Sequence, residues 1–145
     1  MEPEQVARAM YDQDASAAAL GIELVSAGTD GAVARMTVRP DMCNGLHIMH
    51  GGMTFLLADS AMAFASNAAN VVALASSAAI DWLAPVEVGQ VVTATAVRRA
   101  GGGRSSLWDI SVTVDDGSVE GTLVALVRGR TRQVGRPVVS DGRSS

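Results

Sequence analysis

The sequence places one carboxylate inside an apolar helix, where an ionised side chain is costly. Asp59 lies near the middle of residues 53–69, which are apolar nearly all round and are therefore predicted to form a buried helix. Burial penalises the charged form of a carboxyl group and raises its pKa, which suits a general base or a nucleophile. A structural aspartate bonded to a neighbouring strand fits the position equally well, so the residues alone leave both interpretations open.

Two glycines, Gly51 and Gly52, stand where this helix is predicted to begin. The first amides of a helix have no partner inside the helix, and the helix dipole attracts negative charge to that end. Because glycine lets a ligand approach the backbone closely, such an end can stabilise the oxyanion that forms when a carbonyl is attacked. A plain glycine-rich helix entry would look the same.

The distance between these two features suggests a shared site. Gly51 and Asp59 lie about 12 Å apart along one helix, at roughly 1.5 Å per residue. An aspartate side chain cannot cover that distance. If both groups serve one reaction, they must come from different chains, and a two-fold homodimer with antiparallel central helices would build two equivalent sites.

His47 and His50 are the only histidines in the chain. Three residues apart in a predicted loop, they are a poor basis for a metal site. A Ser-His-Asp triad is also disfavoured, because no Gly-x-Ser-x-Gly turn is present. His50 could orient a substrate or simply hold the loop. Asn44, which forms a turn signal with Gly45, could offer its amide to a water or a carbonyl.

Composition narrows the class of protein. A chain of 145 residues is one domain by length, and a net charge of -4 argues against nucleic acid as a partner. All eleven basic residues are Arg, so Schiff-base chemistry and a P-loop are excluded. Cys43 is the only cysteine, which excludes a disulfide framework. The acidic start does not fit a signal peptide, and a cytoplasmic protein is expected.

Residues 55–80 are apolar over a length that could span a bilayer. They include Asp59, Asn67 and Asn70, however, and no Lys or Arg flanks them closely. We therefore expect a buried helix followed by a buried strand, and no membrane partner.

The order of elements predicts an α+β fold in which an antiparallel sheet curls around one long helix. Helical spacing predicts a helix over residues 3–19, and alternation around Trp108 is typical of a half-buried strand. The predicted strands cover residues 21–27, 32–38, 71–83, 90–99, 105–115 and 120–130. A single domain is expected over residues 1–135, followed by a flexible tail over 136–145.

The run His50-Gly51-Gly52, followed seven residues later by Asp59 in an Ala-rich helix, resembles the hotdog-fold acyl-CoA thioesterases of the phenylacetic-acid-degradation type. Similar segments follow downstream, at residues 80–85, 92–96, 108–110 and 124–129. The resemblance covers roughly residues 18–135 and is specific in its combination.

This resemblance implies a function and roles for four residues. The substrate would be an aryl- or phenylacetyl-CoA thioester, hydrolysed without metal or other cofactor. Asp59 would be the catalytic carboxylate, and the Gly51 amide would polarise the thioester carbonyl. Asn44 and His50 match positions that orient the carbonyl and the water. Members of the family are commonly homotetramers built from dimers. Whether Asp59 attacks the thioester or activates water stays open.

Further residues are expected to bind the substrate. Gly52 allows close approach at the helix start, and Phe55 and Met62 are expected to line the acyl pocket. Ser76 or Ser77 would replace a polar residue that some relatives place near Ala75 to assist water.

The last third of the chain carries an excess of arginine. Residues 98–136 contain seven Arg against four acids, and Arg side chains suit the phosphates of coenzyme A. Arg104 and Arg130 are the candidates we select. A solvated basic edge is equally compatible with any single Arg.

Two other classes of protein share the expected fold. A hydratase or dehydratase would need a His and acid pair acting on the substrate's alpha and beta carbons, and Asp59 does not fit such a signature. A non-catalytic acyl-CoA sensor needs no carboxylate in its pocket. Asp59 is therefore the residue that favours a thioesterase.

Overall fold

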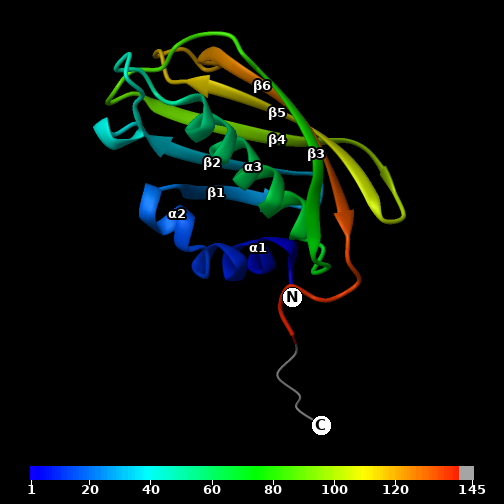
Figure 1. The fold of residues 1–145 in the computed structure, drawn as a ribbon. Helices are drawn as coiled ribbons and strands as arrows, with labels where there is room; N and C mark the ends of the chain where they lie inside the picture. The colour runs from blue at the N-terminus through cyan, green and yellow to red at the C-terminus, as the bar shows by residue number, and fades with distance from the viewer. Residues whose placement is uncertain (141–145) are drawn as a thin grey trace.

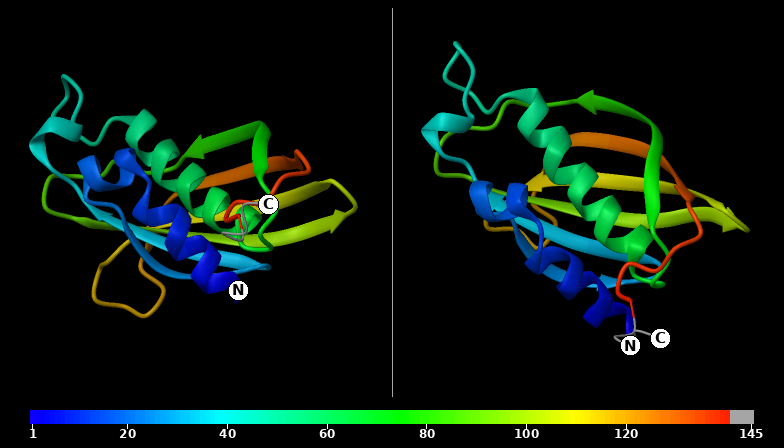
Figure 2. Two further views of the ribbon diagram at one scale, coloured as in Figure 1. Left: turned by 90° about the horizontal axis from the view of Figure 1, so that it is seen from below. Right: turned by 60° about the horizontal axis from the view of Figure 1, so that its bottom comes forward.

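The computed structural model describes residues 1–140 and shows one sheet curled around one long helix (Figures 1 and 2). The sheet has six strands in the order β1-β2-β4-β5-β6-β3, and every neighbouring pair is antiparallel. The strands are β1 Glu23–Gly28, β2 Gly31–Thr37, β3 Ala73–Trp82, β4 Val91–Gly102, β5 Ser105–Val114 and β6 Thr122–Gln133. The predicted α+β hotdog architecture is confirmed.

The central helix α3, Gly51–Asn67, begins two residues before its predicted start. His50 causes the shift, because its Nδ1 accepts the Gly52 amide at 2.9 Å and so caps the first turn. At the other end, Asn67 is buried and ties the helix to β3. Its Oδ1 accepts the Ala73 amide at 2.9 Å, and its Nδ2 donates to the Ala73 carbonyl at 3.1 Å.

The core lies between α3 and the concave face of the sheet (Figure 2). Small residues let the two layers approach closely, since Ala58, Ala61 and Ala65 on the helix are all buried. Gly129 of β6 is required by the same packing, because a Cβ there would collide with the Met62 sulfur. The low aromatic content of the chain is therefore compatible with a dense core.

The N-terminal helical segment is two helices rather than the single helix predicted over residues 3–19. α1 covers Pro3–Asp12 and α2 covers Ala15–Leu20. The break occurs because Asp14 caps α2, with its Oδ1 accepting the Ala17 amide at 2.9 Å. The preference of aspartate for the N-cap position could have been recognised in the sequence, but the helical spacing of the apolar residues suggested one continuous helix.

Strand β3 is the edge of the sheet and most of its side chains are exposed. A register shift between Ala75 and Ser77 marks a bulge at Ser76. No helix among residues 1–140 is long and apolar enough to cross a membrane. The apolar run of residues 55–80 is instead divided between α3 and β3, as expected.

The predicted flexible tail begins at a segment that is hydrogen bonded. The Val72 amide donates to the Arg136 carbonyl at 2.8 Å. Asn70 exchanges two hydrogen bonds with the backbone of Val139, at 2.9 and 3.3 Å. Residues 141–145 of the predicted tail lie outside the described residues.

Candidate active site

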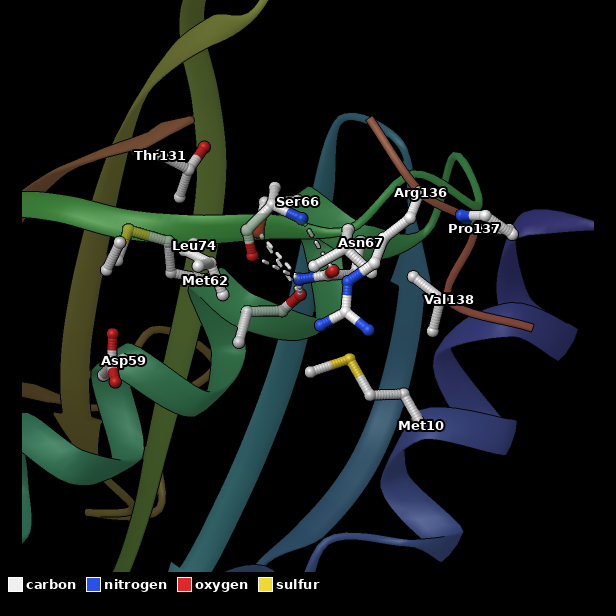
Figure 3. A pocket seen from close by; sticks show the side chains of 14 residues that line it. Met10, Asp59, Met62, Ser66, Asn67, Leu74, Thr131, Arg136, Pro137 and Val138 are labelled. Carbon is white, nitrogen blue, oxygen red and sulfur yellow. Dashed lines mark hydrogen bonds between the residues drawn. The ribbon is translucent and has the colours of Figure 1, made fainter. Parts of the chain in front are cut away.

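Asp59 is half-buried in the middle of α3 and faces a cavity (Figure 3). Its pKa is raised above the ordinary value, and the cause is burial. Within residues 1–140 its carboxylate accepts no hydrogen bond and forms no ion pair. The alternative interpretation of a structural aspartate bonded to a neighbouring strand therefore has no bond to support it in the chain described.

The cavity beside Asp59 has a volume of about 430 Å³ and is largely apolar. It lies between the second half of α3, the start of β3 and the segment after β6. Figure 3 shows Asp59 on one side of it and Arg136 on the other, near Asn67 and Met10. Its apolar wall includes the side chains of Met10, Met62, Val72, Leu74 and Val138.

The start of α3 presents a backbone amide without a partner. Gly51 is the first residue of the helix, and its amide donates no hydrogen bond within residues 1–140. The Gly52 amide is already taken by His50 Nδ1, so His50 must carry its proton on Nε2 when neutral. A carbonyl oxygen that approaches this end would therefore meet the free Gly51 N–H and the positive end of the helix dipole.

An open cleft of about 620 Å³ adjoins this helix start and is strongly apolar. Its lining residues come from the first turns of α3 and the second half of β3: His50, Gly51, Gly52, Phe55, Ala78, Ile80 and Trp82. The cleft therefore offers an apolar surface directly beside the free amide.

Asn44 lines a second cleft at the helix start. It holds the preceding loop, with its Oδ1 accepting the Leu46 amide at 2.9 Å. Its Nδ2 donates no hydrogen bond within the described residues, and Asn44 lines a cleft of about 350 Å³ together with Gly51 and Trp82. The amide group of Asn44 is thus placed to donate to the same region as the Gly51 N–H.

One chain does not bring Asp59 and Gly51 together. The cavity at Asp59 and the clefts at Gly51 have no lining residue in common. The two residues that we expected in one pocket are divided in the same way, with Met62 beside Asp59 and Phe55 beside Gly51.

Comparisons with known proteins identify the family of this chain. Residues 46–120 match the thioesterase superfamily. The acyl-coenzyme A thioesterase PaaI of Escherichia coli is 39% identical over 137 residues, which cover 94% of this chain and 95% of that protein. This chain belongs to the PaaI-type hotdog acyl-CoA thioesterases.

Solved structures of the family superpose well on this chain. The Escherichia coli PaaI protein from the phenylacetic acid degradation operon has a TM-score of 0.86 and 41% identity, covering 92% of this chain and 94% of that one. A mutant of the phenylacetic acid degradation protein PaaI from Thermus thermophilus has a TM-score of 0.77 and 33% identity, covering 83% of this chain and all of that one.

The two serines expected to assist water lie outside the Asp59 cavity of this thioesterase chain. Ser76 Oγ donates to the Arg130 carbonyl at 3.2 Å. Ser77 pairs with Arg130, and the next pair along, Ala78 with Gly129, faces α3 because Gly129 underlies Met62. Ser77 therefore faces the outer side of the sheet. Ala75 lines the cavity in their place.

The arginines of residues 98–136 fall into two groups. Arg98 lies 3.5 Å from Asp30, and Arg99 and Arg128 both bind Asp109. The other four, Arg104, Arg130, Arg132 and Arg136, form no ion pair within residues 1–140. Both candidates for CoA binding are in this second group. Arg136 also lines the Asp59 cavity, a location that the sequence did not indicate.

No group of three or more His, Cys, Asp or Glu side chains among the described residues could hold a metal ion.

Proposed function

We propose that this thioesterase hydrolyses an aryl- or phenylacetyl-type acyl-CoA to the free acid and CoA, with Asp59 as the nucleophile or general base. The observation that carries the proposal is Asp59 itself, which is half-buried beside a cavity, has no partner within residues 1–140, and has a pKa raised by burial. The names of two PaaI relatives associate them with phenylacetic acid degradation. The apolar cleft at the start of α3 suits an aromatic acyl group.

The reaction needs a base or nucleophile and an oxyanion donor. In the general-base route, Asp59 takes a proton from a water that attacks the thioester carbonyl, and the CoA thiolate leaves. In the nucleophilic route, Asp59 attacks the carbonyl itself and the CoA thiolate leaves. Water then hydrolyses the mixed anhydride, which releases the free acid and regenerates the Asp59 carboxylate. In both routes the Gly51 amide donates to the oxyanion. Asn44 Nδ2 and His50 Nε2–H orient the carbonyl and the water.

The active site is proposed to be shared between two subunits. Asp59 and Gly51 are eight residues apart on the unbroken helix α3, about 12 Å by its rise, and their cavities are separate. Strand β3 supports a dimer, because it is an edge strand with a long exposed row of unpaired backbone groups. A two-fold partner would bring its own Gly51 to Asp59. Assembly of dimers into a homotetramer stays a prediction.

The experiment that tests the substrate class is a thiol-release assay over phenylacetyl-, benzoyl-, acetyl- and palmitoyl-CoA. We expect kcat/KM to be highest for the aryl substrates, because a rigid ring fills an apolar cleft at little entropic cost. A preference for palmitoyl-CoA would contradict the aryl assignment while leaving the thioesterase family intact. Absence of hydrolysis of all four would contradict the proposed function.

Complementation between two inactive variants tests the shared site. One variant is Asp59→Asn. The other is Gly51→Pro, which removes the amide donor at a helix position that tolerates proline. A Cβ at residue 51 would come within 2.9 Å of the Trp82 indole, so Gly51→Pro is combined with Trp82→Leu in the same chain.

Each mixed dimer has two active sites, and one of them is undamaged. Because half of randomly re-associated dimers are mixed, activity is expected to recover to about a quarter of the wild-type value. Fluorescent labels on the two variants confirm subunit exchange. If exchange is complete, both variants fold and activity does not recover, each chain holds a complete site of its own.

A further inference from the structure

Trp82 makes a contact that the proposed reaction has not used. It is the last residue of β3, and its indole Nε1–H donates to the Gly51 carbonyl at 3.1 Å. The ring lies so close that a Cβ on Gly51 would be 2.9 Å from Nε1 and 3.0 Å from Cε2. The end of the edge strand is therefore fastened to the first residue of α3.

This contact is not part of the hydrophobic core. Trp82 is 56% exposed as a residue, whereas the chain's other tryptophan, Trp108, is 2% exposed and belongs to the core. Trp82 and Gly51 are also the two residues that line both clefts at the helix start. Trp82 therefore stands between the two clefts and bonds the backbone at the helix start, outside the core of its own chain.

The helix start needs such a restraint, because its first two residues are glycines. Glycine has the greatest backbone freedom of any residue, and an oxyanion donor must lie within about 2.7–3.1 Å of the developing charge. Two side chains restrain this turn. His50 Nδ1 holds the Gly52 amide at 2.9 Å, and Trp82 holds the Gly51 carbonyl. Neither bond uses the Gly51 N–H, which has no acceptor among residues 1–140 and can donate to the substrate.

We propose that Trp82 is a positioning residue for the reaction, which holds the Gly51 amide in the orientation that donates to the thioester oxyanion. This inference rests on the proposed function, since it assumes that Gly51 is the oxyanion donor. Trp82 acts through Gly51 and takes no part in bond making. Its effect should therefore appear in the transition state and not in the binding of CoA.

The test is Trp82→Phe, which keeps an aromatic ring and removes the N–H donor. We expect kcat to fall about five- to tenfold, the size associated with one hydrogen bond, with KM changed less than about twofold. The same loss is expected with a pantetheine thioester, because the effect lies at the carbonyl. Trp82→Leu, which also removes the ring, should lose no less.

A second measurement separates positioning from general destabilisation. With glycine-selective 15N labelling, the order parameter of the Gly51 amide should fall in Trp82→Phe, while the melting temperature stays within about 2 °C of wild type. An unchanged kcat in a folded Trp82→Phe overturns the inference, whether or not the order parameter falls. So does a rise in KM with kcat unchanged, which would indicate a ligand-contact role.

Failure of this inference is distinguishable from failure of the proposed function. Wild type and Asp59→Asn are assayed in parallel on the same substrates. If wild type hydrolyses these substrates and Asp59→Asn does not, the proposed function stands, whatever the result for Trp82→Phe.

Discussion

Two aspartates of this chain occupy opposite environments. Asp59 lies on α3, half-buried and without a partner in the described part of the chain, and burial raises its pKa. Asp109 lies on β5, where it accepts hydrogen bonds from Arg128 Nε at 2.7 Å and from Arg99 Nε at 2.9 Å. These bonds lower the pKa of Asp109 to about 2.

The difference is the one expected between a carboxylate that reacts, the role proposed for Asp59, and one that is structural. A carboxylate already bonded to two guanidinium groups has its lone pairs occupied and its basicity reduced. A carboxylate held in an apolar helix without bonds keeps its basicity and is available to a water or a carbonyl. An unpaired Asp59 carboxylate lowers the stability of the fold, and such a loss of stability is common at functional sites.

The largest expected effect distinguishes the two aspartates by activity. Asp59→Asn should lower kcat at least about a hundredfold, the low end for loss of a positioned acid or base. Asp109→Asn, the matched control with the same change of atoms, should stay within about threefold of wild type. Thiol release under saturating acyl-CoA measures both. Retention of most activity by a folded Asp59→Asn would remove Asp59 from the mechanism.

A smaller effect distinguishes the arginines that form no ion pair within residues 1–140 from those bound to Asp109. Arg104→Ala or Arg130→Ala should raise KM for acyl-CoA several-fold with little change in kcat, as loss of uniform binding does. The exposed control Arg128→Ala, whose charge is already paired, should change KM less. A pantetheine thioester, which lacks the nucleotide phosphates, should not respond to any of the three. Equal losses on both substrates would indicate a structural role.

The smallest effect is on stability, and we expect it to have opposite signs for Asp59→Asn and Asp109→Asn. The raised pKa of Asp59 means that the fold favours its protonated form. That contribution is complete below the ordinary carboxyl pKa and is lost as pH rises through the raised value, so Asp59→Asn should raise the melting temperature at pH 7 by a few degrees (about 2–5 °C). The gain should disappear in acid.

Asp109 behaves in the reverse sense. Its lowered pKa contributes stability above the ordinary carboxyl pKa, and that stability is lost as pH falls from about 4 towards about 2. Asp109→Asn should therefore lower the melting temperature at pH 7, by no more than a few degrees because the arginines are exposed. Scanning calorimetry at one protein concentration and several pH values measures both variants. A change of melting temperature in the same direction for both variants would contradict the comparison of the two aspartates.

The sequence by itself determined most of the elements and indicated most of the candidate site residues. The apolar run around Asp59 is too long for one strand and therefore indicates a buried helix, whereas alternation around Trp108 has the period of two that buries one face of a strand. The His50-Gly51-Gly52 run and Asp59 carry the family resemblance, which the relatives confirm. Even the separation of Gly51 from Asp59 follows from helical rise alone.

Only the tertiary structure decided which side chains meet. The pairing of Asp109 with Arg99 and Arg128 depends on the register of three strands, which the residues of any one strand do not encode. The bond from Trp82 to Gly51 joins positions 31 residues apart, and no local pattern marks it. Periodicity reports which face of an element is buried, but contacts between elements arise from packing them together, and so they appear only in the folded chain.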